Sequence, residues 1–111
     1  MEKFAVGSVI LVSFPFSNLK GKKIRPALVL ARAEFDDLIL CQITSKPYAS
    51  KSAIRIESTD FIEGKLPVVS YIRPDKLFTA DASITEKTAG KLTKKCIDAS
   101  LQAARTLFIL K

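Results

Sequence analysis

The segment Phe14–Leu30, FPFSNLKGKKIRPALVL, joins two apolar runs through a short basic turn. The turn, Ser17–Ile24, contains one glycine, Gly21, which suits a positive-φ position in a hairpin. After Pro26 both alternating faces are apolar, which is typical of a strand buried on both sides. Because proline has no N–H to donate, the strand must begin or lie at a sheet edge there. The stretch therefore predicts a hairpin leading into a central strand, Ile24–Ala31.

Outward from this hairpin, short apolar runs alternate with turn signals over the first three-quarters of the chain, which predicts a compact antiparallel β domain. The expected strands are Ser8–Phe14, Ile24–Ala31, Asp37–Thr44, Ala53–Glu57, Val68–Ile72, Lys76–Ala80 and Ser83–Thr88. The short, alternating run Ala53–Glu57 is typical of an edge strand. The two runs on either side of Pro74 are expected to continue the sheet around it.

The hydrophobic period changes after Thr93, whose side chain can serve as a helix N-cap. From there apolar residues recur at helical spacing, at Ile97, Leu101, Ala104 and Phe108. Polar residues fill the other positions, so we expect an amphipathic helix that packs on the sheet. Many short strands and one terminal helix predict a mainly β, α+β fold: a small SH3-like β-barrel with a C-terminal helix, in one domain spanning residues 1–111.

The composition narrows the class of protein. Of the 111 residues, 48% are hydrophobic, which argues against disorder, and no apolar run reaches the ~20 residues of a membrane span. The N-terminal residues do not have the pattern of a secretory signal. Cys41 and Cys96 lie within apolar patterns, so we expect buried thiols in a reducing compartment, with a disulfide as the alternative.

The charge balance limits the chemistry. The net charge of +7 favours a polyanionic partner, either nucleic acid or an acidic protein. The chain has no histidine, which excludes histidine-based acid–base catalysis and the Ser-His-Asp and Cys-His arrangements. It also lacks a CxxC pair or any cluster with metal-ligand spacing, so neither a zinc site nor another cofactor is expected.

Two candidate groups surround the basic turn. Lys20, Lys22 and Lys23 form either a solvated turn or a cationic flap that contacts phosphates. Arg25 is held extended by the proline after it and stands at the entrance of the central strand, as a surface arginine or a phosphate ligand. Phe16 lies beside the turn and either packs in the core or stacks on a nucleobase.

Two further groups lie at the ends of later strands. In CQITSK, Thr44 ends a strand just before Ser45 and Lys46, and its hydroxyl either donates to a phosphate oxygen or simply fills the strand. In YIRPDKLF, Arg73 and Asp75 are two residues apart, so in an extended chain they point to one face, roughly 6–7 Å apart. They form either a structural ion pair or an acid–base and phosphate-clamp pair.

Taken together and in order, GSVILVSFPF…KGKKIRPALVL, LILCQITSK and SYIRPDKLFTAD resemble the MazF/PemK (Kid-like) toxins of type II toxin–antitoxin systems. The resemblance implies an SH3-like barrel with a helix, a cytoplasmic homodimer, and a metal-independent endoribonuclease that cleaves single-stranded RNA, often mRNA at short sequences. It also implies inhibition by a small acidic antitoxin that covers the RNA groove, and binding of operator DNA through the antitoxin complex.

By position, the arginine of the family's Arg-Pro motif falls on Arg25, and its strand-end threonine falls on Thr44. The Arg and Asp that act in proton transfer in the Kid-like branch fall on Arg73 and Asp75. Two departures concern the proton relay: Ser8 stands where many members have an acidic residue, and the histidine that the Kid-like branch has near its first loop is absent.

The resemblance implies attack of the RNA 2′-OH on the adjacent phosphorus, with departure of the 5′-oxygen. Asp75 would be the base, Arg73 the acid or clamp, Arg25 the group that stabilises the phosphorane, and Thr44 a hydroxyl donor. The RNA-binding residues would be Phe16, Lys20, Lys22, Lys23, Ser45 and Lys46.

Two alternatives remain open at this point. The same barrel also serves non-catalytic toxins that bind a protein target such as DNA gyrase. An inactive relative could instead act only in antitoxin binding and autoregulation of its operon.

Overall fold

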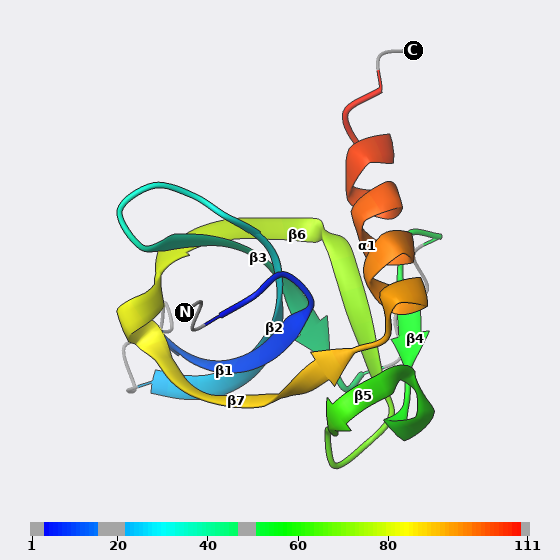
Figure 1. Cartoon of the computed structure of the whole chain (residues 1–111), viewed down its shortest axis with the longest axis horizontal. Coiled ribbons are helices and arrows are strands. Elements are labelled where there is room, and N and C mark those ends of the chain that lie inside the picture. Colours follow the sequence, from blue (N-terminus) through cyan, green and yellow to red (C-terminus); the bar gives the residue numbers. More distant parts are fainter. Residues whose placement is uncertain (1–3, 16–21, 47–50, 110–111) are drawn as a thin grey trace.

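The computed structural model describes residues 4–15, 22–46 and 51–109 and forms one curled antiparallel sheet with a helix at its side (Figure 1). Seven strands are arranged in the order β4-β6-β3-β2-β1-β7-β5. The helix α1 stands against one side of this half-barrel, where it contacts β6 and β2 (Figure 1). The expected mainly β architecture, an SH3-like barrel with a C-terminal helix, is confirmed.

The elements have the following bounds. The strands are β1 Ser8–Pro15, β2 Lys22–Arg32, β3 Asp37–Thr44, β4 Ile54–Ile56, β5 Phe61–Gly64, β6 Ser70–Asp81 and β7 Thr85–Leu92. The helix α1 spans Lys94–Thr106, and two 3-10 turns, η1 Ser58–Asp60 and η2 Ala82–Ile84, precede β5 and β7. The predicted bounds of β3 are confirmed, and β4 lies at a sheet edge as expected.

Four of the sequence expectations need correction. The strand β2 begins at Lys22, so Lys22 and Lys23 belong to the strand and not to the turn before it. The two runs around Pro74 are one continuous strand, β6. The strand expected from Ser83 begins only at Thr85, because η2 comes first. The strand β5 was not expected.

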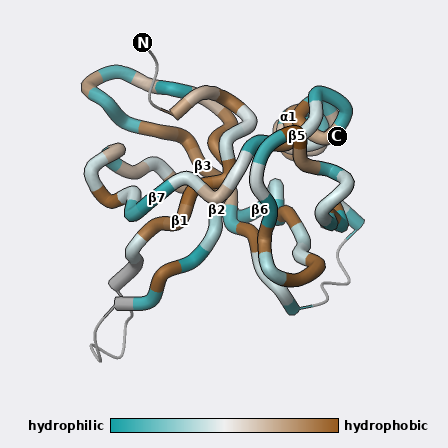
Figure 2. Tube along the Cα trace, turned by 60° about the horizontal axis from the view of Figure 1, so that its bottom comes forward, coloured by the Kyte–Doolittle hydropathy of each residue, from teal (hydrophilic) through white to brown (hydrophobic). Residues whose placement is uncertain are grey.

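Each face of the curled sheet covers its own hydrophobic cluster. One contains Val9, Leu28, Leu30, Cys41, Ile43, Ile56, Ile72, Leu92, Cys96 and Ala104, with Ile97 and Leu101 of α1 packed on it. The other contains Ile10, Val12, Ala27, Val29, Leu38 and Leu40. Figure 2 shows hydrophobic residues concentrated in the middle of the molecule, where β1, β2 and β3 lie side by side. Because the middle parts of these strands are buried on both sides, their sequences are continuously apolar there, as in PALVLA of β2 and LILC of β3.

Pro26 lies where β2 has a neighbour on one side only. It is paired with Leu11 of β1, whereas the described pairing of β2 with β3 runs from Ala27 to Arg32. The open side accommodates the missing N–H of the proline. The edge position expected at Pro26 is therefore confirmed, although the strand itself starts at Lys22.

A bulge in β6 changes which face its side chains occupy. Cys41 of β3 is paired with Leu77, but the next residue, Gln42, is paired with Arg73. Residues 74–76 are therefore extra, and Pro74 among them is fully buried. In a regular strand Arg73 and Leu77 would share a face. The bulge places Leu77 against the α1-side cluster and turns Arg73 to the opposite face.

The helix begins as the sequence predicts and ends sooner. The Oγ1 atom of Thr93 accepts a hydrogen bond from the backbone N–H of Cys96 at 3.3 Å, which confirms the N-cap. The helix ends at Thr106, so Phe108 lies beyond it and is 72% exposed. The expectation that Phe108 continues the buried face is wrong. No helix among the described residues is long and apolar enough to cross a membrane.

Both cysteines are free and buried, which confirms the expectation from their apolar surroundings. Burial raises the pKa of the Cys41 thiol to about 12, and the nearby charge of Asp75 raises it further, against a hydrogen bond with the backbone of Leu28. Burial likewise raises the pKa of Cys96.

Candidate nucleic-acid interface

The strand register brings three predicted catalytic residues to one face of the sheet, and the fourth, Asp75, contacts one of them, Arg73. Ala27 of β2 is paired with Gln42 of β3, and Gln42 with Arg73 of β6, so these three side chains share a face. The same alternation places Arg25 and Thr44 on this face, one step further along β2 and β3. Together with Asp75 these residues form the "polar row", which consists of Arg25, Gln42, Thr44, Arg73 and Asp75.

Arg73 and Asp75 form a partly exposed ion pair across the buried Pro74. The Nη2 atom of Arg73 donates to Oδ2 of Asp75 at 3.3 Å, and the two side chains are 20% and 31% exposed. The two side chains are thus in direct contact, as an arginine and a carboxylate two positions apart on one face can be. Arg55 and Glu57 make the same kind of contact at 3.0 Å.

Thr44 is held in place by the chain that follows it. Its Oγ1 accepts a hydrogen bond from the backbone N–H of Lys46 at 3.2 Å, which leaves the hydroxyl hydrogen available to donate. Tyr71 of β6 is its register partner and is half-buried. The hydroxyl is therefore fixed at the end of β3 with its donor capacity unused by this bond.

A cation-rimmed pocket adjoins the polar row. It has a volume of about 560 Å³ and is lined by Leu11, Ile24, Arg25, Pro26, Ile43, Ser45, Lys65, Leu66, Pro67, Val68, Ser70, Lys87, Thr88 and Ala89. Three of these residues are cationic and none is acidic. We call it the "basic pocket". Arg25 belongs both to its lining and to the polar row. The lining residues Pro26 and Ile43 alternate with that row and lie on the other face of the sheet, so the pocket and the row meet at Arg25.

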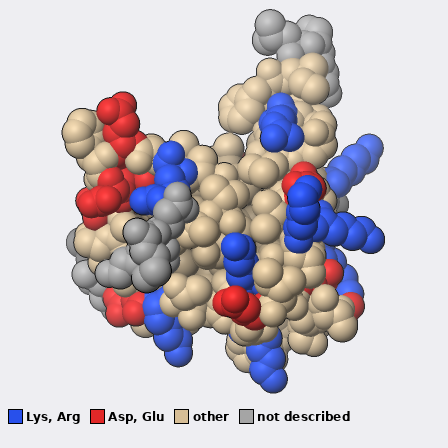
Figure 3. All heavy atoms as spheres, viewed as in Figure 1, with Lys and Arg blue, Asp and Glu red and all other residues tan. Residues whose placement is uncertain are grey.

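The charges are unevenly distributed over the molecule. In the view of Figure 3, acidic side chains gather over the β2–β3 connection, whereas Lys and Arg lie mainly over the rest of the visible face. Lys65 and Lys87 of the basic pocket come from the β5–β6 connection and from β7. The cations of the pocket are thus supplied by segments far apart in the sequence.

The remaining predicted RNA-binding residues are dispersed. Ser45 lines the basic pocket, and Lys23 and Lys46 are exposed. Lys22 is the first residue of β2 and is paired with Pro15. Phe16 and Lys20 lie outside the described residues.

Sequence reasoning missed Lys65 and Lys87 of the basic pocket. Lys87 stands between two other exposed polar residues of β7, and Lys65 follows a glycine in the connection between β5 and β6. Neither position carries a local signal, since only the packing of β7 beside β1 brings Lys87 toward Arg25. The Leu66–Pro67 pair, which completes the wall, was missed for the same reason.

The arrangement offers acid–base and anion-binding groups. It contains a carboxylate that can accept a proton, two guanidinium groups, and a hydroxyl donor beside a cation-rimmed pocket. Such groups suit a phosphodiester, which needs charge stabilisation at its non-bridging oxygens. No group of three His, Cys, Asp or Glu side chains that could hold a metal ion occurs among the described residues.

Comparison with solved structures shows the same fold in known proteins. The Mycobacterium tuberculosis toxin MazF-mt6 is 18% identical, with 94% of this chain and 98% of that chain covered and a TM-score of 0.72. A MazE-MazF structure from Deinococcus radiodurans gives 18% identity, 92% coverage of each chain and a TM-score of 0.73. An endoribonuclease in complex with its cognate antitoxin, from a mycobacterial species, is 14% identical, with 96% of this chain and 93% of that chain covered and a TM-score of 0.71.

Comparison with curated protein sequences gives no match. A family model, however, matches nearly the whole chain, over residues 5–108. The model is described as the PemK-like, MazF-like toxin of type II toxin–antitoxin systems. With this match and the half-barrel described above, the chain belongs to the PemK-like, MazF-like toxin family.

Proposed function

We propose that the chain is a metal-independent endoribonuclease that cleaves single-stranded RNA, including mRNA, at preferred short sequences. One observation carries the proposal: the polar row and the basic pocket share Arg25. A phosphate held by Arg25 can therefore lie on the same face as the Arg73–Asp75 pair, while the neighbouring nucleotides pass the end of β2 and follow the cation-rimmed pocket on the other face. The family membership supports the same activity.

In the proposed reaction, the carboxylate of Asp75 accepts the proton of the RNA 2′-OH. The O2′–P bond forms and the P–O5′ bond breaks, which leaves a 2′,3′-cyclic phosphate and a 5′-hydroxyl end. Arg25 and Arg73 stabilise the charge on the phosphorane, and Thr44 donates a hydrogen bond to a non-bridging oxygen. The departing O5′ takes a proton from Arg73 or from water that Arg73 orients.

The inhibitor and the assembly are part of the proposal. We infer a cytoplasmic homodimer whose groove is covered by a small acidic antitoxin, and operator binding by the resulting complex. Two of the similar structures are complexes: one is an endoribonuclease with its cognate antitoxin, and the other is MazE with MazF. The cationic rim of the basic pocket, formed by Arg25, Lys65 and Lys87, would attract an acidic chain as it would RNA.

The test is cleavage of a long RNA by the purified chain in excess chelator, with the ends mapped. We expect cleavage by the parent and by Arg105→Ala, an exposed site on α1, and at least a ~100-fold loss in Arg25→Ala. Thermal unfolding of each variant checks that the fold is retained. Intact RNA with the folded parent would overturn the nuclease and favour a binding-only toxin.

A further inference from the structure

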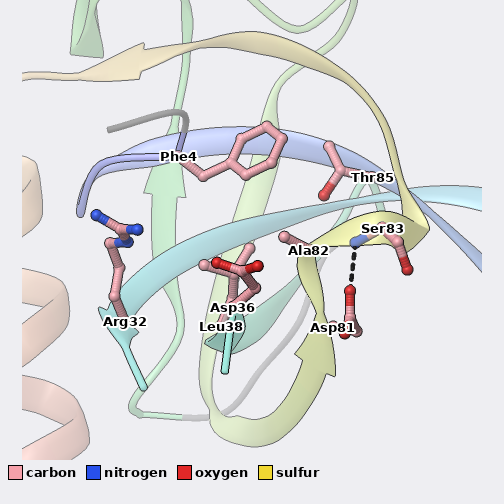
Figure 4. A pocket seen from close by; sticks show the side chains of 8 residues that line it. All are labelled: Phe4, Arg32, Asp36, Leu38, Asp81, Ala82, Ser83 and Thr85. Carbon is pink, nitrogen blue, oxygen red and sulfur yellow. Dashed lines mark hydrogen bonds between the residues drawn. The ribbon is translucent and has the colours of Figure 1, made fainter. Parts of the chain in front are cut away.

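A second pocket lies at the opposite end of the sheet, and the proposed RNA chemistry does not use it (Figure 4). Its volume is about 390 Å³, and it is lined by Phe4, Arg32, Asp36, Leu38, Asp81, Ala82, Ser83 and Thr85. Leu38 stands near the start of β3 and Thr44 at its end. At about 3.3 Å per residue, the six steps between them separate this pocket from the polar row by about 20 Å.

This end of the molecule is acidic although the chain as a whole carries +7. Two carboxylates, Asp36 and Asp81, and one guanidinium, Arg32, line the pocket, which gives the lining a net charge of −1. Asp37 is directly opposite Asp81 in the register of β3 and β6. Like charges in directly opposite positions destabilise a sheet, and a bound cation would offset that repulsion.

The uncharged part of the lining suits the same kind of ligand. Phe4 presents an aromatic ring, and Leu38 and Ala82 add apolar surface. Figure 4 shows the Phe4 ring, the Asp36 carboxylate and the Thr85 hydroxyl turned toward a common space. An aromatic ring combined with carboxylates is typical of sites for guanidinium or alkylammonium groups.

Thr85 gives an independent indication. Its Oγ1 atom is buried and has no hydrogen-bond partner among the described residues. A buried hydroxyl without a partner destabilises the protein, so such atoms call for a specific explanation. Thr85 lines the pocket, so this oxygen can accept a hydrogen bond from the N–H of a ligand there.

We propose that this pocket binds an organic cation with a guanidinium or alkylammonium head and a short aliphatic stem. Asp36 and Asp81 accept hydrogen bonds from the head, Thr85 accepts one more, and the stem lies along Phe4 and Leu38. Arg32 limits the site to one such head because a second cation would be repelled. The ligand is either a free small molecule or an arginine or lysine side chain of a basic protein.

The test is a titration of the full chain with butylguanidinium chloride, followed by amide-resolved NMR, with neutral N-butylurea as the isosteric control. We expect saturable shifts in the β2–β3 turn and in η2 with the cation and none with the urea. Equal binding of the two compounds, or no shift in these segments, would overturn the proposal.

Two carboxylate-to-amide variants remove the charge and keep the backbone. Asp36 has a φ of 64°, a conformation that asparagine tolerates, so Asp36→Asn keeps the turn. Asp81 accepts from the backbone N–H of Ser83 at 2.8 Å, and an asparagine oxygen can do the same in Asp81→Asn. Each is expected to weaken butylguanidinium binding about tenfold or more, whereas Asp98→Asn on α1 leaves it unchanged. Parent-like binding by both pocket variants would overturn the site.

A third variant separates binding from folding. Thr85→Val replaces the unpartnered hydroxyl with a methyl group, so it should lower affinity for the cation without lowering the melting temperature.

A peptide probe distinguishes the two sources of the ligand. An acetyl-Gly-Arg-Gly-amide probe that binds more tightly than butylguanidinium indicates a basic protein, and equal affinity indicates a free cation. All three pocket variants should cleave RNA like the parent, so this site and the nuclease proposal fail independently.

Discussion

Arg73 and Asp75 contact each other through a 3.3 Å hydrogen bond across the buried Pro74, at the bulge of β6 where residues 74–76 have no counterpart on β3. The sequence motif left two interpretations open, a structural ion pair or a catalytic pair. The geometry is compatible with both, because the pair is in contact and also partly exposed. Mutation can separate the two interpretations.

Asp75→Asn tests whether the carboxylate takes the proton from the RNA. Asparagine keeps the shape and a hydrogen-bond acceptor for Arg73 but cannot serve as a base. We expect the cleavage rate in chelator to fall by ~10²–10⁴, with little change in the melting temperature because the pair is partly exposed. Asp98→Asn, which alters an exposed ion pair on α1, is the matched control and should cleave normally. Normal cleavage by Asp75→Asn would assign the pair a structural role only.

Thr93→Ala tests the N-cap of α1. Removing the hydroxyl leaves the N–H of Cys96 without its 3.3 Å partner, which should lower the free energy of unfolding by about 1 kcal/mol. The control is Thr106→Ala at the other end of the helix, where the hydroxyl donates back to the carbonyl of Gln102. Urea unfolding should show a smaller loss, or none, for this control. Equal losses would mean that the cap contributes nothing specific.

Gly7→Ala tests a close contact between the start of β1 and α1. Gly7 has a φ of +94°, and an added Cβ would lie only 2.8 Å from Cγ1 of Ile97 and closer still to its Cδ1. Strain and overpacking together should lower the free energy of unfolding by about 3 kcal/mol. In a double-mutant cycle Ile97→Ala should recover the overpacking part only. Full additivity of the two substitutions would show that the helix moves aside without cost.

Phe35→Asn is expected to stabilise the protein. Phe35 and Asp36 have φ values of 59° and 64° at the two central positions of the turn between β2 and β3, and Phe35 is 88% exposed. Asparagine tolerates this left-handed conformation far better than phenylalanine, and little buried surface is lost, so a gain of about 0.5–1 kcal/mol should appear in urea unfolding. Phe108→Asn, at a similarly exposed position, should give no gain.

The raised pKa of the Cys41 thiol should make the protein less stable at alkaline pH. Its pKa is about 12 in the folded chain, well above that of an exposed thiol. Above about pH 9 the unfolded chain ionises and the folded chain does not, so the free energy of unfolding falls by roughly 1.4 kcal/mol per pH unit from this group. Unfolding measured between pH 8.5 and 10.5 should show that Cys41→Ala removes this part of the slope. An unchanged slope would contradict the burial of the thiol.

The sequence predicts the parts of the fold that depend on local pattern. The apolar run of β3 and the cap at Thr93 were identified correctly because alternation and capping act within a few residues. Phe108 fits the helical period, but the helix ends before it, and periodicity alone does not report where a helix ends. The strand β5 was missed because it has four residues, three of them exposed, and depends on pairing with β7.

The candidate site likewise contains residues that local motifs identify and residues that only tertiary pairing brings together. Arg25, Thr44, Arg73 and Asp75 could be named because short motifs and the family resemblance mark them. Their common face depends on the register of three strands, and the contribution of Lys65 and Lys87 depends on which strands lie side by side. Both are properties of tertiary pairing, which no local window of sequence contains.

The number of extra residues in the bulge of β6, residues 74–76, is constrained by the side chains on either side of it. Arg73 and Leu77 are four positions apart, so a regular strand would place both side chains on one face. Because of the three inserted residues, Arg73 reaches solvent while Leu77 reaches the interior. Removing one of them, for example Lys76, would leave Arg73 and Leu77 three positions apart, so ordinary alternation would still place them on opposite faces. Removing two would leave them two positions apart, where a regular strand puts both on one face and either buries the guanidinium or exposes the leucine. A deletion scan should therefore show a larger loss of folded protein for the two-residue deletion than for the one-residue deletion.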